Sequence, residues 1–172
     1  MRIKILLLGV FFALNLSAIT VGEVPKKVVI DGENGGAVKG DVAWDSSSIK
    51  EKVYILFYID PDEKDTNEHF SKKLKAKKYD TQNYGSIAIV NLAATWKPNF
   101  VIESILAKKQ KEYTNTIYVK DKNSVLVNEW EIADNASDIL LFSKEGKLLF
   151  YKSGRLSDGD IETVFRLIEE NL

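Results

Sequence analysis

The most constraining feature of the sequence is an uninterrupted apolar run, Val53–Ile59, in the first half of the chain. Seven consecutive apolar or aromatic residues, rich in β-formers, are too short to span a membrane and are typical of a strand buried on both faces. Asp60 and Pro61 follow directly, and Glu63 comes three residues after Asp60. Because an acidic N-cap, a proline at the first helical position and a following acid mark helix starts, the pattern predicts a central strand that feeds a helix.

The carboxyl end of this strand is the first place to look for a functional site. In open α/β sheets, ligands bind in the crevice beyond the carboxyl ends of the strands. Residues 60–63 contain no recognisable catalytic motif. The sequence therefore indicates where a site would lie without indicating its chemistry.

The first residues have the pattern of a secretory signal peptide. Arg2 and Lys4 precede an apolar stretch over residues 5–16, and Ser17 and Ala18 supply small residues at its end. This stretch is too short to span a bilayer stably, so we expect cleavage after Ala18 rather than a retained anchor. Residues 20–22 offer a second cleavage position. The mature chain, residues 19–172, is expected to be a single exported domain without a membrane span.

Charge and cysteine content argue against several classes of function. Two of the 24 basic residues lie in the signal segment, which leaves 22 basic against 25 acidic residues and a mature net charge of −3. A negative net charge disfavours nucleic-acid binding. The chain has no cysteine and one histidine, so disulfides, thiol chemistry and the usual zinc, iron–sulfur and haem sites are not expected. We therefore expect no cofactor.

Strand and helix patterns alternate along the rest of the chain. Strand, helix, strand and helix in succession predict a parallel strand pair with right-handed crossovers. An antiparallel hairpin and a helix capped by Ser157 are expected near the C-terminus. The expected elements are strands at 27–30, 53–59, 85–92, 116–119, 139–142 and 147–151, an extended segment at 125–130, and helices beginning near 60, 98 and 157.

The side chains of the first two expected helices divide between the core and the surface. In the first, Phe70 and Leu74 are expected to face the core. In the second, Phe100, Val101, Ile105 and Leu106 are expected to face inward. Lysines crowd the end of the first helix, namely Lys72, Lys73, Lys75, Lys77 and Lys78. Such lysines complement the helix dipole and are normally solvated, and a contact with anionic lipid or an acidic envelope partner is the alternative.

The order of the expected elements resembles a thioredoxin-like domain of the kind found in exported thiol oxidoreductases. Residues 49–59 look like the strand that delivers the Cys-x-x-Cys motif, but residues 60–63 stand in its place. The proline that faces the thiols should fall just before Ile139, where this chain has Ser137 and Asp138. The resemblance implies an α/β thioredoxin-like fold, with a central mixed β-sheet flanked by helices and an N-terminal β extension, that lacks both halves of the redox site.

An ordered set of short motifs covers essentially the whole mature chain. In chain order they are Trp44-Asp45-Ser46 before Lys52-Val53, Ile89-Val90-Asn91, Pro98 followed by Phe100-Val101 and Ser104, Trp130 after Val125-Leu126, and Ser143-Lys144-Glu145-Gly146-Lys147. This set resembles the YtfJ-type family of bacterial periplasmic proteins. The resemblance implies a thioredoxin-like fold and a periplasmic location, and it transfers no catalytic residue because the family lacks a well-established activity. The label of transcriptional regulator that is sometimes attached to this family conflicts with the signal-peptide pattern and the negative net charge of this chain.

Three carboxylates, Asp60, Asp62 and Glu63, mark the expected start of the first helix. Capping the free backbone N–H groups is the ordinary role of acids at such a position. Oxygen ligands also suit a hard cation such as calcium, although the spacing does not match an EF-hand loop. A carboxylate- or metal-dependent enzyme of unknown substrate is therefore the alternative function for this loop.

His69 is the single histidine and lies beside Glu68 in the expected first helix. A hydrolase could pair a histidine with a carboxylate and a serine. The chain has no Gly-x-Ser-x-Gly elbow, so an ordinary surface or half-buried helical histidine is the favoured interpretation.

A second loop at a strand's carboxyl end carries Trp96 and Lys97. Together with Ser137 and Asp138, they could join residues 60–62 across the top of the sheet in a shallow groove suited to a peptide or protein. Ordinary loop packing would use the same residues. By analogy with thioredoxin-like folds that hold extended polypeptide at this edge, the preferred function is a redox-inactive module that binds a periplasmic protein or peptide.

Overall fold

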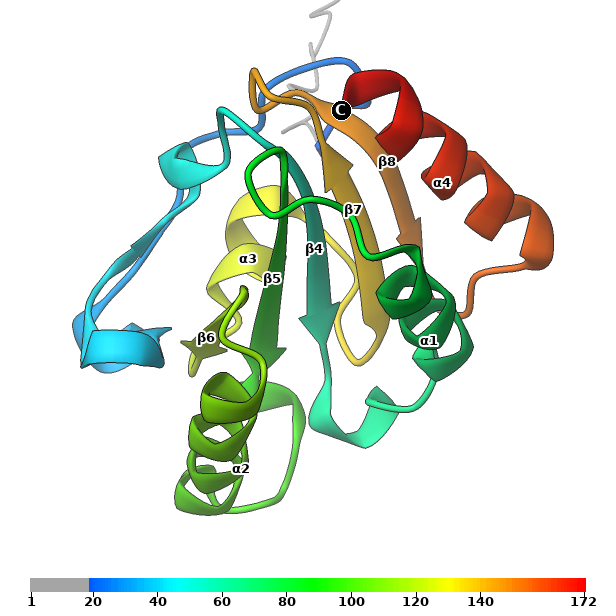
Figure 1. Cartoon of the computed structure of the whole chain (residues 1–172). Helices are drawn as coiled ribbons and strands as arrows, with labels where there is room; N and C mark the ends of the chain where they lie inside the picture. The colour runs from blue at the N-terminus through cyan, green and yellow to red at the C-terminus, as the bar shows by residue number, and fades with distance from the viewer. Residues whose placement is uncertain (1–18) are drawn as a thin grey trace, which may run out of the picture.

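Strand β4 (Val53–Ile59) lies inside a six-stranded sheet in the computed structural model, which describes residues 19–172. The predicted signal peptide lies outside the described residues. The strand order is β2-β6-β5-β4-β7-β8 (Figure 1). The other strands of this sheet are β2 (Gly35–Ala37), β5 (Tyr84–Asn91), β6 (Thr116–Asp121), β7 (Ser137–Phe142) and β8 (Leu148–Ser153).

The sheet is mixed, as predicted. Strand β4 pairs in parallel with β5, and β5 pairs in parallel with β6, which confirms the expected parallel arrangement. On its other side β4 pairs antiparallel with β7, which forms the expected hairpin with β8. The N-terminal β extension supplies β2 at the far edge and a separate antiparallel pair, β1 (Val29–Ile30) with β3 (Trp44–Asp45). The extension also contains three short 3-10 turns, η1 (Gly32–Asn34), η2 (Lys39–Asp41) and η3 (Ser46–Ser48).

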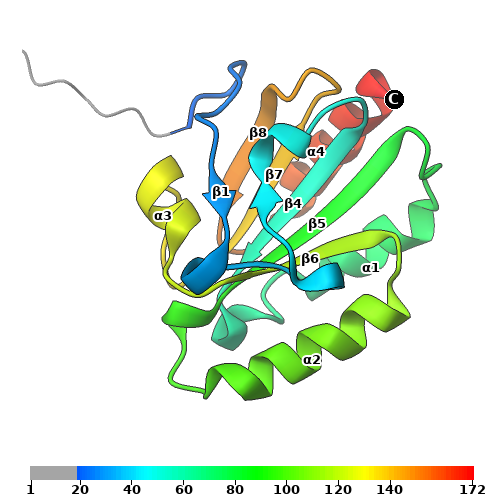
Figure 2. The same cartoon turned by 90° about the vertical axis from the view of Figure 1, so that its left-hand side faces the viewer.

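Helices cover both faces of the sheet. Helices α1 (Glu68–Lys77), α2 (Asn99–Glu112) and α4 (Asp158–Asn171) pack on one face (Figure 1). The short helix α3 (Val125–Trp130) and the β1–β3 pair cover the opposite face (Figure 2). Because side chains alternate along β4, each face of the sheet receives its own apolar cluster, and the strand is buried on both sides.

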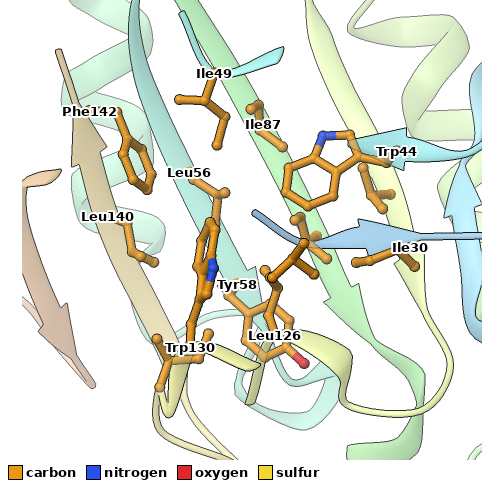
Figure 3. Packing of buried hydrophobic residues seen from close by; sticks show 14 of the residues in the cluster. Ile30, Trp44, Ile49, Leu56, Tyr58, Ile87, Leu126, Trp130, Leu140 and Phe142 are labelled. Carbon is orange, nitrogen blue, oxygen red and sulfur yellow. The ribbon is translucent and has the colours of Figure 1, made fainter. Parts of the chain in front are cut away.

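Trp130 is the largest fully buried side chain on the α3 face. Its ring lies 6.0 Å from that of Phe142 between ring centroids, among Leu126, Leu140 and Tyr58 (Figure 3). The indole N–H donates to the backbone oxygen of Lys26 at 2.8 Å. The N-terminal extension is thereby fixed over the sheet by both apolar packing and a hydrogen bond.

The first helix begins later than predicted. Residues Pro61–Glu63 form a separate 3-10 turn, η4, and α1 begins at Glu68. The residue before α1, Asn67, is buried, and its side chain accepts from the Leu156 amide and donates to the Gly154 oxygen, both at 2.9 Å. Contacts with a distant segment therefore fix the start of the helix, and the local capping pattern at Asp60 serves only the short turn.

Residues 125–130 form helix α3, so the prediction of an extended segment there is wrong. Valine and tryptophan prefer strands, but the contacts of Asp121, which precedes this segment, favour a helix instead. The Asp121 carboxylate accepts hydrogen bonds from the Val125 amide at 2.9 Å and the Leu126 amide at 3.1 Å. These are amides that a helix start leaves without a backbone partner.

The predicted inner face of α2 is wrong except at Leu106, which is buried as predicted. Ile102 and Leu106 are buried against Ala88, Val90 and Tyr118, whereas Phe100, Val101 and Ile105 are exposed. The sequence offers two apolar stripes on this helix, and packing on the sheet selects the stripe that contains Ile102 and Leu106. The other stripe is left facing outward.

Most lysines at the end of α1 form ion pairs. Lys72 pairs with Glu68, Lys73 with Asp158 and Lys77 with Glu169, at 2.8 to 2.9 Å between nitrogen and oxygen. Two of these pairs connect α1 to α4, so these lysines have acidic neighbours within the fold. Phe70 and Leu74 face the core as predicted. No helix within residues 19–172 is both long and apolar enough to cross a membrane.

Helix α4 begins with the predicted cap. Ser157 Oγ accepts from the Asp160 amide at 3.2 Å, and the Asp160 carboxylate accepts from the Ser157 amide at 2.7 Å. Ile161, Val164 and Ile168 are buried against the sheet.

Replacing Ser157 with alanine is expected to lower the free energy of unfolding by about 1 kcal/mol, because it removes the N-cap acceptor of α4. Urea denaturation measures the change. The matched control is Ser104→Ala, since Ser104 lies exposed inside α2 and this change should alter stability by no more than a few tenths of a kcal/mol. Equal effects of the two variants would contradict the capping role.

Candidate functional site

Asp60 follows the last residue of β4 and is buried at the carboxyl end of the sheet. Its amide donates to the Ala136 oxygen at 2.9 Å, and its carboxylate accepts from the Asp62 amide at 2.8 Å. Burial raises the pKa of Asp60, the Asp62 amide opposes this rise, and the nearby acids Asp62, Glu63 and Asp134 add to it. Asp60 thus shapes the turn beneath the surface.

Asp62 joins the two loops at the carboxyl ends of β4 and β5. Its carboxylate accepts from Thr95 Oγ1 at 2.9 Å and forms an ion pair with Lys97. The hydrogen bond from Lys97 is the main cause that lowers the pKa of Asp62. Glu63 lies beside it and accepts from Thr66 Oγ1 at 2.6 Å. Turn η4 is thereby braced against the loop that follows η5 (Leu92–Ala94).

Trp96 is the most exposed large apolar side chain in the described part of the chain, with 85% of its surface accessible. The Lys97 ammonium lies 5.9 Å from the centroid of its ring. Because Lys97 is also paired with Asp62, the Trp96 backbone sits in a braced loop. The structure therefore brings Asp62, Glu63, Trp96 and Lys97 together at one surface, which we call the carboxyl-end surface.

Ser137 and Asp138 lie on β7 and are buried below the carboxyl-end surface. Ser137 pairs with Ile59 on the neighbouring strand, and its hydroxyl accepts from the side-chain nitrogen Nδ2 of Asn67 at 3.1 Å. Asp138 pairs with Tyr58 and is fully buried. These two residues lie next to the end of β4, as predicted, but their side chains contact the interior.

The Asp138 carboxylate has an unusual environment. Neither of its oxygens accepts a hydrogen bond of regular geometry from any group among residues 19–172. Burial raises the pKa of Asp138 to about 6, and the hydroxyl groups of Ser153 and Tyr151 offset the rise only in part. Such a carboxyl group is costly when ionised, and perturbed acids of this kind are commoner at functional sites than elsewhere.

A polar network beside these residues has no counterpart in the sequence-based candidates. The Tyr58 hydroxyl donates to Asp121 at 3.0 Å, and burial, followed by the nearby Asp121 charge, raises the pKa of Tyr58. Asn91 donates to Asp134 at 3.2 Å and accepts from Ser124 Oγ at 3.1 Å. The sequence could have indicated two members of this network, because Asn91 and Asp121 are each the last residue of a parallel strand.

His69 and the acids do not assemble into a recognisable catalytic group in the described chain. His69 Nε2 lies 2.9 Å from the backbone oxygen of Leu156, to which it can donate. Among residues 19–172, no group of three or more histidine, aspartate or glutamate side chains is placed to hold a metal ion. The carboxylates of Asp60, Asp62 and Glu63 are instead engaged with a backbone amide, two hydroxyls and Lys97.

A hollow of about 280 Å³ lies on the α3 face, away from the predicted site residues. Trp130, Phe142 and Ile49 supply apolar lining, and Lys27 and Lys50 also border it. Lys27 is paired with Asp45 at 2.9 Å. None of the residues predicted from the strand ends lines this hollow.

The fold is that of thioredoxin-like proteins, as comparison with solved structures shows. A putative thiol:disulfide interchange protein, DsbE, from Chlorobium tepidum superposes with a TM-score of 0.62 at 14% sequence identity, covering 90% of this chain and 99% of that one. The identity is low, so this likeness establishes the fold alone. The present chain has no cysteine and cannot perform thiol–disulfide exchange.

Sequence relatives point to the family predicted from the ordered motifs. An uncharacterized protein of Haemophilus influenzae is 27% identical over 128 residues, which cover 73% of this chain and 70% of that protein. The uncharacterized protein YtfJ of Escherichia coli is 24% identical over 132 residues, which cover 75% and 72% respectively. A family model described as a bacterial protein of unknown function (YtfJ_HI0045) matches residues 28–171, and the chain therefore belongs to this family.

Proposed function

We propose that this protein is an exported, redox-inactive binding module that holds a polypeptide segment of a periplasmic partner at its carboxyl-end surface. The observation that carries the proposal is the exposure of Trp96 on a loop braced by the Lys97–Asp62 ion pair. Exposed aromatic side chains in a fixed position are typical anchors of protein interfaces, because they bury a large area at a small cost in conformational entropy.

Polar groups around Trp96 suit a polypeptide partner. Lys97 and Glu63 carry opposite charges at the rim, and Asp62 connects the two loops that present them. A central apolar anchor with a polar rim is the usual layout of a non-obligate interface. Asp60, Ser137 and Asp138 belong to this proposal as the buried support below the surface.

Export is part of the same proposal. The basic start, short apolar stretch and small residues at 1–18 favour a cleaved signal peptide, followed by one folded domain over residues 19–172. A thioredoxin-like fold without thiols suits an accessory role in the periplasm, where a recognition surface can remain useful after the redox centre is lost.

Replacing Trp96 with alanine is expected to weaken peptide binding at least about tenfold without lowering thermal stability, because the side chain is exposed. Peptides enriched from a random displayed library on the chain from Ile19 onward are the probes, and fluorescence anisotropy measures their affinity. The control is Val42→Ala, which removes another exposed apolar side chain. Absence of any enriched peptide, or equal effects of both variants, would refute the proposal.

A further inference from the structure

The outward side of α2 carries an apolar stripe that no part of the described chain covers. Phe100 is 73% exposed, Ile105 is 45% exposed and Val101 is 37% exposed. Lys108 and Lys111 continue the same face toward the end of the helix and are also exposed. These five residues form the α2 outer face, which lies opposite the buried Ile102 and Leu106.

The end of α2 is basic. Lys108, Lys109 and Lys111 form no ion pair within residues 19–172, and Glu112 is the acid nearest to them in sequence. Lys75 of α1 lies over the Tyr113 ring, 5.0 Å from its centroid, which adds a further cation at this end. By contrast, Lys72, Lys73 and Lys77 of α1 are paired with acids. Unpaired positive charge is thus gathered next to the exposed apolar stripe.

We propose that the α2 outer face binds the surface of a bilayer that contains anionic phospholipid. The helix lies flat on this surface, with Phe100, Val101 and Ile105 among the headgroups and upper acyl chains. Lys108 and Lys111 contact the phosphates. Aromatic and aliphatic side chains on one part of a helix and lysines on the rest are the composition of helices that lie in a membrane interface.

Charge favours lipid over a second copy of this chain. Packing two α2 outer faces together would bring Lys108 and Lys111 of each copy into one interface, where the exposed Glu112, one helical turn beyond Lys108, supplies a single acid per copy. Anionic headgroups supply the negative charge that such an interface lacks. The mature chain is acidic overall, so the attraction is local to this end of the molecule and should fall as salt screens it.

The test is flotation of the chain from Ile19 onward, which contains every described element, with vesicles of phosphatidylglycerol and phosphatidylcholine in equal parts. We expect binding at low salt that is lost at high salt. Lys108→Glu with Lys111→Glu should weaken binding at least about twentyfold, since each lysine near an anionic surface contributes about fivefold. Phe100→Ser with Ile105→Ser should weaken it about tenfold or more.

A matched control reverses two exposed lysines elsewhere, Lys50→Glu with Lys147→Glu. Lys50 borders the hollow on the α3 face, and Lys147 follows Gly146 of the same hollow. This control changes net charge equally and should retain most binding. Because all the substituted side chains are exposed, we expect every variant to keep the fold, and circular dichroism checks this.

Several outcomes would overturn the inference. These are no binding by the unmodified chain, equal binding to pure phosphatidylcholine, or equal losses in the lysine variant and its control. A concentration-dependent dimer that the α2 variants abolish would assign the face to a second copy instead. The inference goes beyond the proposed function and fails separately from it, because the peptide test depends on Trp96 and the vesicle test on α2.

Discussion

Replacing Asp138 with asparagine is expected to raise the free energy of unfolding at pH 7.5 by about 1–2 kcal/mol. The ionised carboxylate is fully buried and only weakly stabilised by the nearby Ser153 and Tyr151 hydroxyls, and its pKa is raised from 3.8 to about 6. A shift of this size corresponds to about 3 kcal/mol at neutral pH, and burying the asparagine amide offsets part of the gain.

The sign of the pH dependence follows from proton binding. Between about pH 4 and 6 the native state holds a proton on Asp138 that the unfolded chain has released. The contribution of Asp138 to the free energy of unfolding is therefore greatest at low pH. It decreases as the pH rises from about 4 to 6 and stays constant at higher pH. The variant should be the more stable protein above pH 6.5, and its advantage should vanish as the pH falls, leaving it about 1 kcal/mol less stable than the unmodified chain near pH 4, where only the cost of burying the amide remains.

Urea denaturation of both proteins at several pH values measures this difference directly. Other carboxylates, such as Asp160, whose pKa is lowered to about 2 chiefly by its hydrogen bond with Lys152, change both proteins equally and cancel in the comparison. The matched control is Asp65→Asn, because Asp65 is exposed and pairs with the exposed Lys64. A pH-independent difference, or a destabilised variant at pH 7.5, would contradict the prediction.

Replacing Asp121 with alanine is expected to lower the free energy of unfolding by about 4 kcal/mol. The buried carboxylate accepts from the Tyr58 hydroxyl and from the Val125 and Leu126 amides, at 2.9 to 3.1 Å. Each buried donor that loses its acceptor costs about 1–3 kcal/mol. Since α3 carries Trp130, loosening of this helix should also change the tryptophan fluorescence of the native protein.

Tyr58→Phe is the comparison that isolates the helix start. It removes the hydroxyl donor but leaves Asp121 to accept from the two amides of α3, so the expected loss is about 1 kcal/mol. Equilibrium urea denaturation gives both values. If Asp121→Ala costs no more than Tyr58→Phe, the carboxylate does not hold the start of α3.

Elements with strong local signals were predictable from the sequence. The run at β4 is buried on both faces, and the capping box at Ser157 starts α4 where expected. In both cases the residues that decide the structure are neighbours in the chain. Helix α1 and segment 125–130 were mispredicted because Asn67 and Asp121 act through contacts that a local pattern does not reveal.

The candidate site was predictable as a place and less so as a set of side chains. The rule that parallel strands end at one edge brings Asp62 and Trp96 together, as their loops show. It does not say which side chains turn inward, and Asp60, Ser137 and Asp138 are buried. The outward stripe on α2 was missed because its residues are as apolar as those that pack on the sheet.

The strand order also fixes when the protein can fold. Strand β4 is flanked by β5, which follows soon after it, and by β7, which comes from the last quarter of the chain. Until β7 is available, one edge of β4 has no partner, and the groove for α4 is absent. Pairing over such sequence distances is slow, and unpaired apolar edges invite association with other chains. A chain with this topology therefore closes its core only once its C-terminal third is available.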